Sequence, residues 1–226
     1  MRVLAIDTAL EACSAALLDT GAGMMLARQS RVMVRGHAEA LLPLISDVMV
    51  SAEIDFTQID RVAVTTGPGS FTGLRVGLSA ARGIGLAAGK PVVGLTTMAA
   101  LAAPYIAADD TTSVAVAIDA RHGHVYLQIF GPAGRTIVAP RIVPVAEAVR
   151  AAANAPVRLV GSGAGMMAAA WPNLPPPLSI DERRAADIDW VARLGAAANE
   201  SQSAPKPLYL RAPDAQPQSA SQLPRR

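Results

Sequence analysis

The chain has 226 residues, of which 51% are apolar, only 17% are charged and 4% are aromatic, and its formal net charge is +2. A chain of this length buries roughly 70% of its unfolded surface, enough for one large domain or two small ones. So small a charge excess argues against a dedicated nucleic-acid-binding protein, which concentrates Lys and Arg on one face. A chain this apolar often hides part of its surface in a partner.

The sequence predicts a cytoplasmic protein without a membrane span. The first apolar run, Val3–Ile6, stops at Asp7 and is too short for a signal peptide. Arg75 and Arg82 interrupt the best candidate for a spanning segment. The single cysteine, Cys13, excludes an internal disulfide and suits a reducing compartment. Because Cys13 falls inside an apolar strand, we expect a buried thiol rather than a nucleophile.

The first half of the chain alternates strands and helices in a ribonuclease-H-like order. Hydrophobic patterning and turn residues predict strands over Val3–Ile6, Cys13–Leu18, Met24–Val34, Arg61–Thr65 and Val92–Gly94, and helices over His37–Ala52, Phe71–Ala88 and Thr97–Ile106. Three strands, a helix, a strand, a helix and a strand therefore form one unit. This order predicts an α/β fold.

The second half repeats this order. Its expected strands are Ser113–Asp119, His124–Phe130, Thr136–Ile142 and Val157–Val160, and its expected helices are Val145–Ala153, Gly163–Trp171 and Ala186–Asn199. LAIDT and VAIDA open the two halves in the same way. The chain is therefore predicted to be a duplicated, two-lobed fold of the actin, sugar-kinase and heat-shock-chaperone architecture. We expect lobes over 1–108 and 109–211, with the last helix able to pack back on the first lobe. The Ala-, Pro-, Gln- and Ser-rich tail, 212–226, is predicted to be disordered.

The most informative motif is TTGPGSFTGLRVG, from Thr65 to Gly77. It forms a tight strand-to-helix turn whose glycines are Gly67, Gly69, Gly73 and Gly77. Such a turn points free backbone N–H groups outward, which suits either an anion or a closely packed neighbour. It lacks the Gly-Lys-Ser/Thr of a Walker A loop, and the neighbours of Ser70 do not fit a G-x-S-x-G elbow.

Two aspartates, Asp7 and Asp119, each end the first strand of a repeat. In nucleotide-hydrolysing members of this architecture a carboxylate at this place handles Mg²⁺ and water. The alternatives are a capping aspartate or the remnant of a lost site, and the apolar Ala9 nearby favours a remnant. Arg121 suits either an anion or a surface salt bridge. A possible vestigial phosphate or nucleotide region therefore comprises Asp7, Thr8, Gly67, Gly69, Ser70, Asp119 and Arg121. His122 and His124 lack a third ligand, so no metal site is expected.

Two helices predict a protein interface. The residues 37–52 and 71–88 are apolar on more than one side, whereas an ordinary surface helix keeps its apolar stripe to one side. The alternative is burial beneath the second lobe. The predicted interface residues are His37, Leu41, Leu42, Ile45, Val48, Met49, Leu74, Leu78 and Ala81.

Together with the glycine motif, five further segments resemble the TsaB (YeaZ) family of bacterial tRNA threonylcarbamoyladenosine biosynthesis proteins. They are AIDT (Ala5–Thr8), HAEALLP (His37–Pro43), KPVVGLTT (Lys90–Thr97), AIDARHGHVY (Ala117–Tyr126) and PLYLR (Pro207–Arg211). The resemblance runs from about residue 2 to Arg211.

This resemblance implies a non-catalytic scaffold or activator for threonylcarbamoylation of the adenosine beside the tRNA anticodon (position 37). It implies a heterodimer with a TsaD-like catalytic subunit, a TsaE-like ATPase that joins the complex, and a homodimer when the chain is alone. Transfer RNA would be met only through the complex. No cofactor would be bound firmly, although ATP or ADP is possible at a subunit junction.

TsaD-type chains hold a metal through histidines in an HHMEGH-like segment, and the matching segment in this sequence is TTMAAL. Thr97 and Leu101 take the two histidine positions and Ala99 the glutamate position, so the resemblance implies neither a metal site nor catalytic residues of that kind. The competing hypothesis is an ATP-dependent kinase or hydrolase that uses Asp7, Asp119 and the glycines at 161, 163 and 165. Ala120, Arg121 and His122 count against it, because such enzymes place glycine and Thr/Ser there.

Overall fold

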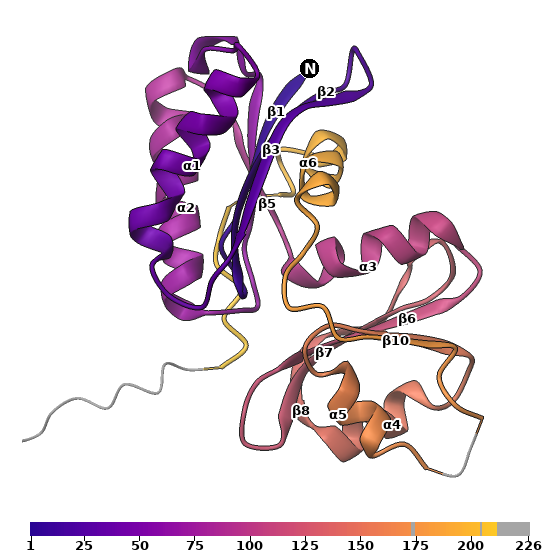
Figure 1. The fold of residues 1–226 in the computed structure, drawn as a ribbon. Coiled ribbons are helices and arrows are strands. Elements are labelled where there is room, and N and C mark those ends of the chain that lie inside the picture. Colours follow the sequence, from indigo (N-terminus) through magenta and orange to yellow (C-terminus); the bar gives the residue numbers. More distant parts are fainter. Residues whose placement is uncertain (173–174, 204, 212–226) are drawn as a thin grey trace, which may run out of the picture.

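Two lobes, each built on a five-stranded sheet, make up the structure, a computed structural model that describes residues 1–172, 175–203 and 205–211. Figure 1 shows the first lobe in indigo and purple above the second in magenta and orange. The predicted disordered tail, 212–226, lies outside the described residues.

The first repeat has strands and helices close to the predicted ranges. Its elements are β1 (Arg2–Asp7), β2 (Ala12–Asp19), β3 (Met24–Val32), α1 (His37–Ser51), β4 (Arg61–Thr65), α2 (Phe71–Ala88), β5 (Val92–Leu95) and α3 (Thr97–Ala108), with a 3₁₀ turn at Phe56–Gln58. Ser70 begins α2 by accepting a hydrogen bond from the Gly73 amide, and Gly89 ends it in the left-handed region.

The second repeat has the same element order. It consists of β6 (Ser113–Asp119), β7 (His124–Phe130), β8 (Thr136–Pro144), α4 (Val145–Ala152), β9 (Val157–Val160), α5 (Ala164–Ala169), β10 (Ser179–Asp181) and α6 (Ile188–Ala197), with a 3₁₀ turn at Pro132–Gly134. The predicted β-β-β-α-β-α unit is thus present twice. The short β10 was not predicted, because three residues after a proline-rich loop carry no periodicity.

Strand order confirms the duplication. The first sheet runs β3-β2-β1-β4-β5, and the second runs β8-β7-β6-β9-β10. In the first sheet β1 pairs antiparallel with β2 and parallel with β4, so that Ala5 faces Ala16 on one side and Ala63 on the other. β6 pairs in the same way with β7 and β9. The predicted α/β, two-lobed fold class is therefore confirmed.

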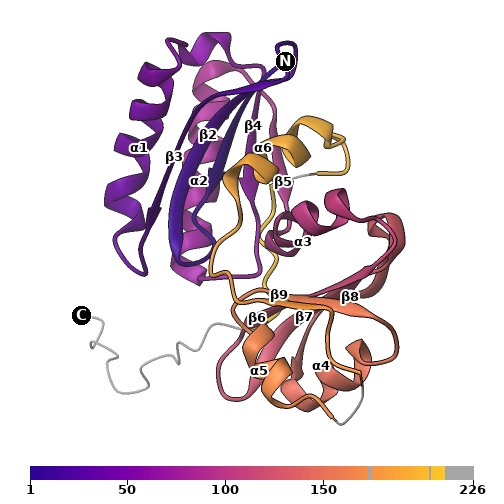
Figure 2. The ribbon, with the colours of Figure 1, turned by 45° about the vertical axis from the view of Figure 1, so that its right-hand side comes forward.

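The last helix of each repeat packs on the sheet of the other repeat. α1 and α2 cover the outer face of the first sheet, and α4 and α5 cover the outer face of the second (Figure 1). α3 of the first repeat packs on β6, whereas α6 of the second repeat packs on β1, β2 and β4, as Figure 2 shows from another side. One apolar core joins Ala5 and Val116 of the two sheets to Leu101 of α3 and Val191 of α6. Packing therefore places α3 with the second sheet, although the repeat boundary falls after it.

Arg61 fixes the end of α6 to the first sheet. Its Nη1 donates to the carbonyl oxygens of Gly195 at 2.9 Å and Ala198 at 2.9 Å, and its Nη2 meets Glu200 Oε1 at 2.6 Å. A cation at a helix C-terminus donates hydrogen bonds to carbonyl groups that lack helical partners, and it interacts favourably with the negative end of the helix dipole. Arg61 therefore holds α6 on the first sheet.

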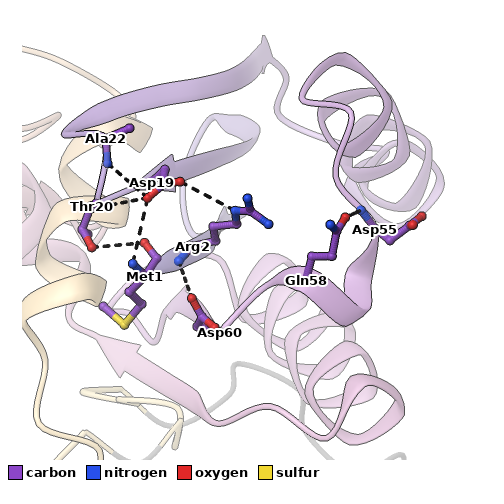
Figure 3. A network of polar contacts seen from close by, with 9 residues as sticks. Met1, Arg2, Asp19, Thr20, Ala22, Asp55, Gln58 and Asp60 are labelled. Carbon is purple, nitrogen blue, oxygen red and sulfur yellow. Dashed lines mark hydrogen bonds and ion pairs between the residues drawn. The ribbon is translucent and has the colours of Figure 1, made fainter.

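A polar network lies at the end of the first sheet where β1 begins and β2 ends (Figure 3). The Arg2 amide donates to Asp60 Oδ2 at 2.7 Å, and Asp19 Oδ2 lies 3.6 Å from Arg2 Nε. Asp19 Oδ1 also accepts from the Gly21 amide at 2.8 Å, and this bond contributes most to lowering the pKa of Asp19. The network joins the start of β1 to the turn between β2 and β3.

None of the described helices is long and apolar enough to cross a membrane.

Candidate functional site

A cleft of about 560 Å³ lies between the lobes. Its walls come from the turn after β1 (Ala9–Glu11), the glycine turn before α2 (Pro68–Thr72), the end of β6 (Ile118–Arg121) and the C-terminal segment Leu208–Arg211. The cleft brings together four residues of the predicted phosphate region, which are Gly69, Ser70, Asp119 and Arg121. Asp7, Thr8 and Gly67 are not among its lining residues.

The glycine turn packs against Thr8 and Ala9, the two residues that follow β1. An added Cβ at Gly69 would come closer than 3.0 Å to the carbonyl oxygen of Ala9, and one at Gly73 would come as close to that of Thr8. The Ser70 amide donates to the Ala9 oxygen at 2.7 Å, and Thr8 Oγ1 donates to the Gly73 oxygen at 2.7 Å. The predicted alternatives for this turn were binding an anion and packing closely against a neighbour. The structure shows close packing, and the Ala9 carbonyl oxygen takes up the Ser70 amide that an anion would use.

Asp7 is completely buried. Its Oδ1 accepts hydrogen bonds from Thr65 Oγ1 at 2.5 Å and from the Ala9 amide at 3.0 Å, whereas Oδ2 has no partner among the described residues. Burial raises the pKa of this carboxyl above its usual range, and the bonds from Thr65 and Ala9 oppose that rise only in part. A carboxyl that is enclosed in this way fits the remnant interpretation better than a group that handles a ligand in the cleft.

Asp7→Asn is expected to stabilise the protein at neutral pH. Burial raises the pKa of Asp7 in the folded state above its ordinary value of 3.8. Below pH 3.8 the carboxyl is protonated in both the folded and the unfolded protein, so it does not lower the free energy of unfolding. As pH rises through the raised pKa, the buried carboxyl becomes charged and the free energy of unfolding falls. The gain should approach the order of 1–3 kcal/mol at pH 8 and vanish near pH 3.5. Urea unfolding followed by circular dichroism at several pH values measures it.

The matched control is Asp19→Asn. Backbone N–H donors and nearby cations lower the pKa of Asp19, so its contribution is present above the ordinary value and lost as pH falls. Asp19→Asn should therefore destabilise at neutral pH. A lower unfolding free energy for Asp7→Asn at pH 8 would show that the Asp7 carboxylate has a stabilising partner.

Asp119 and Arg121 form the facing wall. Asp119 Oδ1 accepts from the Arg121 amide at 2.7 Å, and the Asp119 amide donates to Ser162 Oγ at 3.0 Å. Arg121, His122 and Gly123 all have positive φ, at 62°, 53° and 72°, so the backbone turns sharply here. Asp119 therefore caps a turn, one of the predicted alternatives. Arg121 makes no ion pair within the described residues and lines the cleft.

The positions that align with metal-binding histidines lie in the packed interior. Thr97 is fully buried and its amide donates to the Gly67 oxygen at 2.8 Å. Leu101 is fully buried in the core between the lobes. His124 Nδ1 lies 2.9 Å from the His122 carbonyl oxygen. Among the described residues, no group of three His, Cys, Asp or Glu side chains could hold a metal ion.

The helical interface prediction needs a correction. Eight of its nine side chains are buried within the chain, namely His37, Leu41, Ile45, Val48, Met49, Leu74, Leu78 and Ala81. Leu41, Ile45, Val48 and Met49 recur at helical spacing and pack with Leu4, Leu17 and Val62 of the first sheet. They face the protein's own core, so a partner cannot reach them in this fold.

The outer face of α1 and α2 carries different apolar side chains. Leu42 is 60% exposed, Val50 is 74% exposed and Leu86 is 86% exposed. Small exposed residues, Ser79 and Gly83, leave room on α2 for a close neighbour. We name the exposed side of these two helices the α1–α2 face. Leu42 alone of the predicted interface residues belongs to it.

Several lining residues of the cleft were not predicted. Glu11 and Arg184 form an ion pair at 3.2 Å between the lobes, and Ser162, Tyr126 and Tyr209 also line the cleft. Tyr209 lies in PLYLR, a segment singled out only by family resemblance. The sequence has only three tyrosines, and two of them, Tyr126 and Tyr209, line the cleft, so their scarcity was a usable signal.

The duplicated topology and the cleft between the repeats define a two-lobed protein of the actin, sugar-kinase and heat-shock-chaperone architecture. A family model described as TsaD, tRNA N6-adenosine threonylcarbamoyltransferase, matches residues 29–174. YeaZ from Pseudomonas aeruginosa has a similar structure, with a TM-score of 0.77 and 28% identity over 92% of this chain and 99% of that chain.

Two relatives show how far the sequence similarity extends. The TsaB protein of Escherichia coli, named for tRNA threonylcarbamoyladenosine biosynthesis, is 40% identical over 126 residues, which is 56% of this chain and 53% of that protein. An uncharacterised protein of Mycobacterium tuberculosis is 34% identical over 95% of this chain and 94% of its own length. The chain belongs to the TsaB (YeaZ) family, and its match spans about half the length of the Escherichia coli relative.

Proposed function

We propose that the protein is a non-catalytic subunit in the threonylcarbamoylation of tRNA at the adenosine beside the anticodon. In this proposal its α1–α2 face docks a TsaD-like catalytic subunit, and a TsaE-like ATPase joins the complex in the cytoplasm. The observation that carries the proposal is the exposure of Leu42, Val50 and Leu86 on two adjacent helices. Large apolar side chains exposed on two helices in contact favour a protein partner.

The cleft supports a scaffold rather than an enzyme. The Ala9 carbonyl oxygen accepts a hydrogen bond from the Ser70 amide, and Asp7 is buried and does not itself line the cleft. A chain with a net charge of +2 has little means to hold tRNA alone, so we propose that tRNA is met only through the complex. ATP or ADP would bind at a subunit junction, and the α1–α2 face would pair with a second copy when the catalytic subunit is missing.

The test is complex formation with the cognate TsaD-like subunit, measured by light scattering after size exclusion and by calorimetry. The wild-type chain should form a one-to-one complex. Leu42→Asp and Leu86→Asp each place a carboxylate on the α1–α2 face and should weaken the complex at least about tenfold. Leu178→Asp is the matched control, because Leu178 is 57% exposed on the second lobe.

Two results would contradict this assignment. One is unchanged affinity in the double variant Leu42→Asp, Leu86→Asp with its fold intact by circular dichroism. The other is ATP hydrolysis by the isolated chain that Asp7→Asn abolishes, which would favour the competing kinase or hydrolase. An equal loss of affinity in Leu178→Asp would place the docking surface elsewhere.

A further inference from the structure

The C-terminal segment returns from α6 to the cleft. After α6 the chain passes β5, where the Gly94 amide donates to the Ser203 oxygen at 2.7 Å. It then runs beside α2, where Arg82 Nη2 donates to the Pro205 oxygen at 2.5 Å. Figure 1 shows this yellow segment descending from α6 to the gap between the lobes. We name Pro205–Arg211 the strap.

Three contacts hold the strap on the first lobe. Besides the bond at Pro205, the Leu208 amide donates to the Thr66 oxygen at 2.8 Å. The Tyr209 ring lies 4.9 Å from the ring of Phe71, in the first turn of α2. The Arg75 guanidinium covers the same Phe71 ring at 3.8 Å.

Arg211 of the strap reaches the second lobe. Arg211 Nη1 donates to the carbonyl oxygen of Ala120 at 2.8 Å, directly after β6. Ala120 is part of the facing wall of the cleft, and residues Leu208–Arg211 line the cleft themselves. The strap thus crosses from one wall to the other and ties the lobes without a covalent link.

The glycine turn leaves space for this crossing. Gly67 has a φ of 107°, a value that side-chain-bearing residues avoid, and an added Cβ would lie 3.0 Å from the Leu208 oxygen. A larger residue would push the strap away from Thr66. The first lobe therefore receives the strap at the same turn that packs against β1.

We propose that the strap is a latch that sets the opening of the cleft, and that its release lets the lobes move apart. The covalent connections between the lobes, Thr96 before α3 and the residues between β10 and α6, lie at the inner helices. The strap closes the cleft from a different place. It has no helix or strand, and Tyr209 is partly exposed, so its contacts open at lower cost than the core.

Distances between spin labels across the lobes test the latch. Ser46→Cys on α1 and Ala146→Cys on α4 are exposed labelling sites, and the chain's only cysteine, the buried Cys13, is replaced by alanine. The combined change Tyr209→Ala, Arg211→Ala removes the ring contact and the bond to Ala120. We expect its distance distribution to be longer and broader than that of the parent. Lys206→Ala, an exposed strap position, is the control and should match the parent.

Hydrogen exchange of the Leu208 amide shows whether the strap itself is released. In the Tyr209→Ala, Arg211→Ala variant this amide should exchange about tenfold faster, because its bond to Thr66 opens more often. Faster exchange with an unchanged distance distribution would overturn the proposal, since the lobes would hold their spacing without the strap. Unchanged exchange would also overturn it, because the two contacts would then not hold the strap.

Discussion

Gly73→Ala should destabilise the protein by at least about 3 kcal/mol, whereas Gly83→Ala on the same helix should stabilise it by about 0.5–1 kcal/mol. The added methyl at Gly73 would meet the carbonyl oxygen of Thr8, a backbone atom directly after the central strand β1 that cannot move aside. At Gly83 an added Cβ meets nothing within 4 Å. There the substitution only removes the conformational freedom that glycine gives the unfolded chain.

Urea unfolding followed by circular dichroism distinguishes the two variants. Midpoints that shift in opposite directions, with unchanged slopes, would agree with the close packing of α2 on β1. Gly69→Ala should follow Gly73→Ala, because its methyl would meet the Ala9 oxygen. A stability of Gly73→Ala equal to the wild type would mean that α2 can move away from β1, and the filled turn would then be open to an anion.

Leu41→Asp should unfold the first lobe, whereas Leu42→Asp should leave its stability within about 0.5 kcal/mol. Leu41 is buried against the sheet and Leu42, the next residue, is exposed. A carboxylate at Leu41 would be buried without a partner, a change that costs on the order of 4 kcal/mol or more. Melting temperatures and far-ultraviolet circular dichroism of the two variants measure the difference.

The same pair bears on the search for a partner. Loss of a complex by Leu41→Asp or Ile45→Asp would report a damaged fold, because both side chains belong to the core. Loss by Leu42→Asp with an unchanged melting temperature would report the α1–α2 face itself. If Leu41→Asp melted like the wild type, α1 would not pack on the sheet as described.

Local signals in the sequence predicted much of the fold. α2 begins after Ser70 and ends before Gly89, and both limits follow from a capping side chain and a glycine in the left-handed region. The duplicated LAIDT and VAIDA segments placed Asp7 and Asp119 at equivalent strand ends. The strand order is the same in the two sheets, as a duplicated unit requires.

What the sequence did not predict depends on contacts between distant residues. Apolar residues of α1 include both Leu41 and Leu42, and composition alone does not say which side meets the sheet. The spacing of Leu41, Leu44, Ile45 and Val48 carries that information, because it follows one helical stripe. The contact of Arg211 with Ala120 joins positions 91 residues apart, and no local pattern marks it.

The exchange of α3 and α6 between the lobes has a consequence for how the chain becomes folded. A fragment that ends at residue 108 would keep the first sheet but lack α6, leaving the inner side of Ala5 and Ala16 in water. Its own α3 would have no second sheet to cover. A single repeat is therefore not an independent folding unit, because each sheet needs a helix from the other repeat. We expect neither half to become stably folded before the other has been synthesised.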